Sequence, residues 1–132
     1  MNYSAAVLDR VRDPKHAGAL PRDEQHVGTG EAGTLDSGTM TRIQVRVDPA
    51  TFRIADAVFK VFGCSAAIAS ASLVAERLQG ARVSEARAIE ALSVAAELQL
   101  PMERAHVAGL AVRAAQSALD DWERKRCSDL TI

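Results

Sequence analysis

A β-rich run that passes through a single glycine into a helix of small residues constrains this fold more than any other stretch. The run over residues 58–62 ends at Gly63, and Cys64 and Ser65 follow before a segment with helical apolar spacing. Glycine permits the sharp backbone turn that such a junction needs. We expect Ser65 to be the N-cap, so that Cys64 lies just outside the N-terminus of the helix.

The position of Cys64 allows two interpretations. Unpaired backbone N–H groups and the helix dipole favour negative charge at a helix N-terminus, and therefore the thiolate form of a cysteine. A thiolate is the form that binds a metal ion, an iron–sulfur cluster or a transferred sulfur atom. The alternative is a small hydrophobic residue buried at a tight turn, which is a common environment for an isolated cysteine.

Length and charge limit what the chain can be. Its 132 residues predict one domain over residues 1–132, and its net charge of −1 argues against nucleic-acid binding. The sequence shows no long apolar span and no signal-peptide pattern, so we expect a cytoplasmic protein without membrane contact. We expect no disulfide between Cys64 and Cys127 in that compartment.

The N-terminal part predicts one helix and then a glycine-rich region. A short amphipathic helix is expected over residues 3–12, with Ser4 as its cap. Residues 16–38 are rich in glycine and polar side chains. We predict a loop there, a short strand near Val27, and a mobile loop over residues 30–38.

Two following segments predict a β-hairpin. Residues 42–47 alternate apolar and polar side chains, with Ile43, Val45 and Val47 on one face. A turn follows, and residues 54–62 are the expected return strand. The hairpin belongs to an antiparallel sheet with one face in solvent.

The remainder predicts helices. We expect a helix over residues 65–78 ended by Gly80, a short one capped by Ser84, a third over residues 93–98, and a last one starting at Pro101. The buried stripe of the last helix is predicted to be Val107, Leu110, Ala111, Ala114, Ala118 and Trp122. This order predicts an α+β fold, with a small three-stranded antiparallel sheet and helices packed on one face.

Taken together, these stretches resemble the iron–sulfur cluster assembly scaffold family of the NifU/IscU type over nearly the whole chain. The stretches that carry the resemblance are residues 13–18 (DPKHAG), 27–30 (VGTG), 59–64 (FKVFGC), 65–73 (SAAIASASL) and 95–101 (AAELQLP), followed by His106. The resemblance implies an IscU/SufE-like fold and a scaffold function without enzymatic activity. It also implies cysteine desulfurase and apo iron–sulfur proteins as partners, and it leaves a homo-oligomer open.

The resemblance also implies a site, of which the chain keeps only part. The family assembles a [2Fe-2S] cluster on three cysteines with a neighbouring histidine and aspartate. The second cysteine matches Cys64 and the histidine matches His106, whereas the first and third cysteines fall on Ser37 and Val107. The aspartate falls on Thr39. The segment that the family's Hsp70 chaperone reads as Leu-Pro-Pro-Val-Lys is Leu-Pro-Met-Glu-Arg here.

The remaining ligand set is incomplete for a cluster. Cys64 and His106 supply two ligands where a [2Fe-2S] cluster needs four. Asp36, on the expected mobile loop, is a candidate third ligand, and Cys127 could fold back as a fourth. A set of Cys64, His106 and Asp36 with water suits a single zinc or iron ion better than a cluster.

Three functional hypotheses follow. The first is a divergent scaffold that binds a metal ion or cluster weakly through Cys64 and His106 and docks on cluster-assembly partners. The second is a metal-free interaction or regulatory protein that docks on a cysteine desulfurase or an apo-target. The third, ranked last, is a sulfur-transfer enzyme that uses Cys64 and His106 as a thiolate–imidazole pair, since no residue is evident that would orient the pair.

Overall fold

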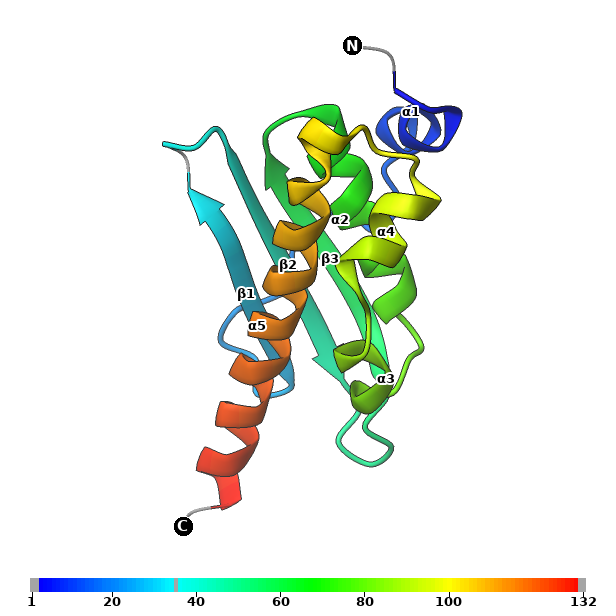
Figure 1. The fold of residues 1–132 in the computed structure, drawn as a ribbon. Coiled ribbons are helices and arrows are strands. Elements are labelled where there is room, and N and C mark those ends of the chain that lie inside the picture. The colour runs from blue at the N-terminus through cyan, green and yellow to red at the C-terminus, as the bar shows by residue number, and fades with distance from the viewer. Residues whose placement is uncertain (1–2, 35, 131–132) are drawn as a thin grey trace.

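The chain folds into a three-stranded antiparallel sheet covered on one face by helices (Figure 1). The computed structural model describes residues 3–34 and 36–130, with side chains described as far as residue 127. The elements are α1 (Ala5–Arg12), β1 (Val27–Thr34), β2 (Thr39–Val47), β3 (Ile54–Phe62), α2 (Ser65–Leu78), α3 (Val83–Arg87), α4 (Ala91–Glu97), a 3-10 turn (Met102–Arg104) and α5 (His106–Leu130). The strand order is β1-β2-β3, which confirms the predicted α+β fold.

The hydrophobic core lies between the sheet and two helices. Helix α5 packs over β1 and β2, and α2 packs over β3 (Figure 1). Ile43, Val45 and Val47 are fully buried on the face that the helices cover, as their alternation predicts. The predicted stripe of α5 is buried as well: Val107, Leu110, Ala111, Ala114, Ala118 and Trp122.

The distal end of α5 is fixed by an aromatic cluster. Trp122 is 2% exposed, and its ring meets that of Phe52 edge to face, with centroids 5.7 Å apart. The Arg126 guanidinium lies 5.1 Å from the Phe52 centroid and 5.5 Å from the Trp122 centroid. These contacts attach the C-terminal half of α5 to the β2–β3 turn.

The opposite face of the sheet is less open to solvent than its pattern predicts. Gln44, expected on the solvated face, is 2% exposed because the loop before β1 crosses over it. Its Oε1 accepts a hydrogen bond from the Leu20 amide (2.9 Å), and its Nε2 donates to the Leu20 carbonyl (2.9 Å) and the Thr29 hydroxyl (3.0 Å). A buried amide with its hydrogen bonds satisfied substitutes for an apolar residue at this position.

A second anchor holds the same loop through charge. Arg46 forms hydrogen bonds to both carboxylate oxygens of Glu24 (2.9 Å each) and to Asp56 (2.8 Å). The hydrogen bonds from Arg46 hold the pKa of the Glu24 carboxyl below its usual range. Leu20 and Glu24 therefore both attach the loop between α1 and β1 to the sheet.

Several predicted boundaries are wrong, each for a local reason. The first strand extends from Val27 to Thr34, so residues 30–34 belong to β1 and not to a mobile loop. Ala55 is exposed instead of sharing the buried face of β3, because an irregularity opposite Arg46 and Val47 places the extra residue there.

The helix starts also differ from the prediction. Arg82, and not Ser84, is the N-cap of α3, and its backbone amide donates to the Glu85 carboxylate at 3.0 Å. Pro101 precedes the 3-10 turn, and α5 begins only at His106. The third helix spans Ala91–Glu97 rather than residues 93–98. Among the described residues, no helix has both the length and the apolar character that a bilayer crossing requires.

The β1 glycines allow α5 to lie directly on the strand backbone. A Cβ at Gly28 would lie 2.9 Å from Trp122 Cβ and would collide with the Ala118 carbonyl. At Gly30 it would collide with the Ala114 carbonyl and the Ala118 amide nitrogen. Only glycine permits this close contact between a helix and a strand.

We therefore expect Gly30→Ala to lower the free energy of unfolding by about 3 kcal/mol, because α5 must move away from β1. The matched control is Gly109→Ala in α5, where an added Cβ meets no atom within 4 Å. The control should raise stability by about 0.5 kcal/mol through helix propensity. Chemical denaturation of both variants measures this, and equal stability of Gly30→Ala and the wild type would contradict the contact.

Candidate functional site

Cys64 lies at the junction between β3 and α2, one position nearer the helix than expected. It is itself the N-cap of α2, with an extended backbone (φ −83°, ψ 171°), and Ser65 is the first helical residue. The Cys64 carbonyl accepts hydrogen bonds from Ala67 and Ile68, both at 3.1 Å, whereas its side chain makes no capping hydrogen bond. The half-buried thiol is thus attached to the positive end of a 14-residue helix.

The turn between β1 and β2 lies directly against this junction. A Cβ at Gly63 would lie 3.1 Å from Thr39 Oγ1 and 3.4 Å from the Gly38 carbonyl, and Gly63 has a positive φ of 153°. The residue before Cys64 and the turn that contains Ser37 are therefore neighbours. Ser37 and Cys64 are therefore each within two residues of this contact along the chain.

Ser37 takes a structural part in that turn. Its hydroxyl donates to the Thr34 carbonyl at 2.8 Å, and its amide donates to the Thr34 hydroxyl at 3.2 Å. These bonds connect the two ends of the turn, as serine and threonine hydroxyls commonly do. A hydroxyl engaged in this way, and rarely deprotonated near neutral pH, is a poor replacement for a thiolate ligand.

The start of α5 reaches the same end of the molecule. Val107 is 1% exposed and forms a small buried cluster with Ala66 and Ala67, against which Cys64 packs. His106, the first residue of α5, is exposed beside this cluster. Figure 1 shows the β1–β2 turn and the starts of α2 and α5 at one end of the fold.

The other predicted ligands are less favourably located. Asp36 is exposed in the β1–β2 turn, and no group of three His, Cys, Asp or Glu side chains that could hold a metal ion occurs among the described residues. Cys127 lies 21 residues after His106 in α5, about 32 Å along the helix axis. The possibility that Cys127 folds back as a fourth ligand is not seen here, because α5 continues as a helix through that residue.

Sequence reasoning missed the two contacts that bring the site together. One is the packing of Thr39 and Gly38 against Gly63, and the other is the contact of Val107 with the first turn of α2. The two glycines on either side of the contact were the available signal, since each has a positive φ where a turn requires it.

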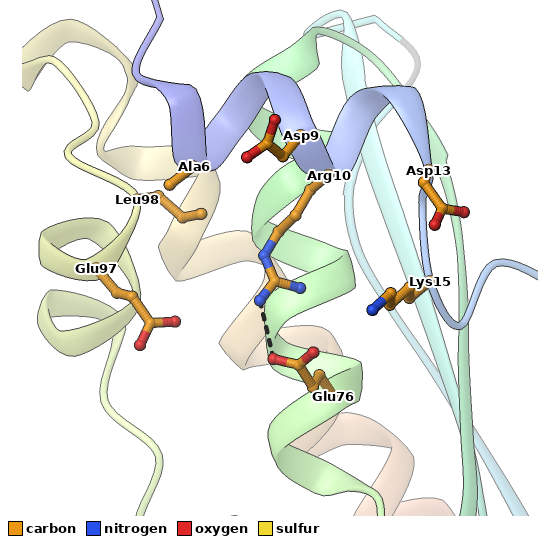
Figure 2. Close-up of a pocket in the computed structure, with 8 residues that line it drawn as sticks. All are labelled: Ala6, Asp9, Arg10, Asp13, Lys15, Glu76, Glu97 and Leu98. Carbon is orange, nitrogen blue, oxygen red and sulfur yellow. Dashed lines mark hydrogen bonds and ion pairs between the residues drawn. The ribbon is translucent and has the colours of Figure 1, made fainter.

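A surface pocket of about 610 Å³ lies away from this site, between α1, α2 and α4 (Figure 2). Figure 2 shows Arg10 reaching from α1 to Glu76 on α2, with a nitrogen–oxygen distance of 2.8 Å. The hydrogen bond from Arg10 holds the pKa of the Glu76 carboxyl below its usual range. The described residues that line the pocket include no cysteine or histidine, so it offers no soft metal ligand.

Further hydrogen bonds around this pocket connect α1 and the segment after it to α2 and α4. The Ser72 hydroxyl donates to the Lys15 carbonyl at 3.0 Å, and the Ser4 hydroxyl donates to the Leu98 carbonyl at 2.6 Å. Arg10 also reaches the Ser72 hydroxyl at 3.4 Å. These contacts dock α1 onto α2 and α4.

Comparison with known proteins identifies similar chains along the whole length. A family model described as the NifU-like N-terminal domain matches residues 2–129. The chain is 39% identical over 126 residues to an iron–sulfur cluster assembly scaffold protein IscU of Rickettsia prowazekii, covering 96% of this chain and 95% of that protein. It is 38% identical over 126 residues to the IscU of Haemophilus influenzae, covering 96% and 99%.

A solved structure shows the same fold. It is a proposed iron–sulfur cluster assembly scaffold protein for the SUF system of Fervidobacterium islandicum AW-1, with a TM-score of 0.69 and 20% sequence identity. The match covers 89% of this chain and 96% of that one. The shared architecture is the three-stranded sheet with helices packed on it.

The Arg10–Glu76 pair predicts an acid-sensitive contribution to stability. Because the pKa of Glu76 is lowered in the folded state, the pair stabilises the protein above the unfolded value of 4.5, and this stabilisation is lost as the pH falls through the folded pKa. We expect Arg10→Met to cost under about 1 kcal/mol at pH 6, because the pair is solvent-exposed, and less at pH 3.

Urea denaturation at the two pH values measures the difference. Arg113→Met is the matched control, since this exposed arginine forms no ion pair with any residue in the described part of the chain. A pH-independent cost of Arg10→Met would show that the Arg10 stem, and not its charge, stabilises the fold.

Proposed function

This chain belongs to the NifU-like N-terminal domain family, and we propose that it is a divergent iron–sulfur cluster assembly scaffold. Cys64 is its main metal-binding residue and His106 the second. Two of the three family cysteines are replaced, by Ser37 and Val107. The protein therefore binds a metal ion or a cluster weakly, and completes the ligand set with groups from outside the chain.

The observation that carries this proposal is that the β1–β2 turn, the start of α2 and the start of α5 meet at one end of the fold. The backbone at Gly63 lies against the β1–β2 turn, and Cys64 packs on the cluster that contains Val107. These contacts around a half-buried thiol support a metal site at this end of the fold.

The residues present do not fit a self-contained [2Fe-2S] cluster. Two irons need four protein or external ligands, and Cys64 and His106 supply two. The Ser37 hydroxyl is engaged with Thr34, and Val107 offers no donor atom. The missing ligands would be thiolates of glutathione, of a second copy of the chain or of a partner protein.

A single ion is the alternative cargo of the same site. Zinc and iron accept mixed sulfur, nitrogen and oxygen ligands, and zinc is satisfied by four of them. Cys64, His106 and water provide three, and Asp36 is the candidate for the fourth. Asp36 is a candidate because it is exposed in the turn that lies against Gly63, the residue before Cys64.

The wider assignments belong to the same proposal. Residues 1–132 form one scaffold domain that acts in the cytoplasm without catalytic activity of its own. Its partners are a cysteine desulfurase and apo iron–sulfur proteins, and neither nucleic acid nor membrane is among them. The names of the relatives support the scaffold function.

A second candidate is a metal-free protein that docks on a desulfurase or an apo-target. It is favoured because no group of three metal-ligating side chains occurs among those that the structure describes, residues 3–34 and 36–127. Metal analysis after aerobic purification distinguishes the two functions. About one equivalent of zinc, lost in Cys64→Ser, supports the ion site, whereas its absence favours the metal-free protein.

Anaerobic incubation with ferrous iron and sulfide tests the cluster proposal. Without added thiol we expect no stable visible chromophore on the monomer, because the chain lacks two cluster ligands. With glutathione we expect a chromophore in the wild type and in the control Cys127→Ser, a much weaker one in His106→Ala, and none in Cys64→Ser. Visible absorption and size-exclusion chromatography follow the product.

Two outcomes would contradict the proposal. A stable chromophore on the monomer without added thiol would show that the chain assembles a cluster by itself. Equal chromophores in Cys64→Ser and the wild type would exclude the thiol as the anchor. Circular dichroism of each variant verifies that the fold is retained.

A further inference from the structure

The free edge of β3 is only partly covered by the chain itself. The Phe59 amide donates to the His16 carbonyl at 3.0 Å, and the Phe59 carbonyl accepts from the Gly18 amide at 3.0 Å. The start of β3 pairs on the same edge through Ile54, which bonds to Ala81 (2.8 Å) and Gly80 (2.7 Å). Beyond Ile54, the short parallel bridge at Phe59 is the only backbone pairing on that edge in the described part of the chain. Edge strands with unpaired backbone groups are templates for another strand.

The backbone groups of Val61 lie on the same edge and are unpaired. Successive residues of a strand direct their N–H and C=O groups to opposite sides, so those of Val61 point the same way as those of Phe59. Among the described residues, no backbone partner is found for Val61 on that side. The pairing at Phe59 therefore does not extend to Val61, the next residue whose backbone groups face that edge.

A groove of about 510 Å³ lies beside this position. Its lining is mostly apolar and includes Ala17 from the covering loop, Phe59 and Val61 from β3, and Ile68 from α2. Val61 and Ile68 are only partly buried. An apolar side chain of an added strand would thus find contacts next to free backbone groups.

Two cations form the rim of the groove. Arg42 and Lys60 line it and are paired directly opposite each other across β2 and β3, an arrangement that costs stability for like charges. Neither forms an ion pair with any described residue. Glu31 is paired with Arg42 across β1 and β2, but its carboxylate forms an ion pair with Arg22 at 3.0 Å. The Lys60 ammonium lies 5.6 Å from the Phe62 ring centroid.

We propose that this edge groove docks an extended acidic segment of a partner protein, which adds a strand beside β3 at Val61. The backbone of the segment pairs with Val61, one of its apolar side chains enters the groove, and its carboxylates meet Lys60 and Arg42. The occupant is acidic because the rim has two positive charges without a carboxylate of their own.

The same charges select against a second copy of the chain. Two copies paired edge to edge would bring Lys60 and Arg42 of one close to Lys60 and Arg42 of the other. Val61 precedes Cys64 by three residues, so a docked segment would lie next to the candidate metal site. The inference rests on the proposed function only in expecting a protein partner, and it requires no bound metal.

The experiment uses metal-free full-length protein and two labelled peptides, one alternating valine with glutamate and one alternating valine with lysine. Fluorescence anisotropy should show saturable binding of the glutamate peptide that weakens with added salt, and no binding of the lysine peptide. Lys60→Glu should weaken the glutamate peptide at least tenfold. Arg113→Glu, an equal charge change on exposed α5 surface, should leave binding within twofold.

Amide hydrogen exchange of the wild type locates the added strand. The glutamate peptide should slow exchange of the Val61 amide and leave that of Lys60, which points toward β2, unchanged. Equal weakening by Lys60→Glu and Arg113→Glu, or a Val61 amide unaffected by saturating peptide, would overturn the proposal. Protection of Val61 by self-association, detected by analytical ultracentrifugation without peptide, would overturn it in favour of a second copy.

Because the assay contains no iron, sulfide or zinc, its outcome is independent of cluster assembly. A bound peptide, with no chromophore on reconstitution in the presence of glutathione and no zinc in the purified protein, would leave the docking edge standing and overturn the metal site. A chromophore that forms on reconstitution, together with no peptide binding, would overturn only the docking edge.

Discussion

The close contact between α5 and the glycines of β1 is the constraint on which the rest of this structure depends. Without side chains at Gly28 and Gly30, the helix backbone lies directly on the strand. The Asp121 carboxylate then accepts a hydrogen bond from the Thr29 amide at 2.9 Å, and Lys125 Nζ donates to the Val27 carbonyl at 2.8 Å. These contacts fix the register of α5 on the sheet. The register determines where the first turn of α5, with His106, meets the first turn of α2, with Cys64.

Much of the fold is predictable from the sequence because its periodic signals are strong. Residues 54–62 and 65–78 are a strand and a helix with the predicted bounds, since each carries one clear pattern between turn residues. The errors occur where tertiary contacts override local pattern. Gln44 is predicted to face solvent but is buried by the Leu20 backbone. Residues 30–34 are predicted to be a loop but pair with β2. No local signal encodes a partner that lies far away in the sequence.

The candidate site is less predictable, because it depends on contacts between elements. The strand–glycine–helix pattern indicates Cys64, and the resemblance adds His106. The exposure of Asp36 and the distance to Cys127 follow only from the fold. The substituted positions are also informative. Ser37 closes its turn through Thr34, and Val107 fills a small apolar cluster, so each serves the packing of its own element where the family has a ligand.

The aromatic cluster at the far end of α5 has a practical consequence. Trp122 is the only tryptophan of the chain, and it is sealed between Phe52 and Arg126. Its fluorescence emission therefore reports whether the C-terminal half of α5 is packed on the sheet. The indole is remote from the thiol, so occupancy at Cys64 should leave its spectrum unchanged unless the whole helix shifts as a rigid rod. A change in Trp122 fluorescence on metal binding at Cys64 would therefore indicate that α5 moves along its whole length.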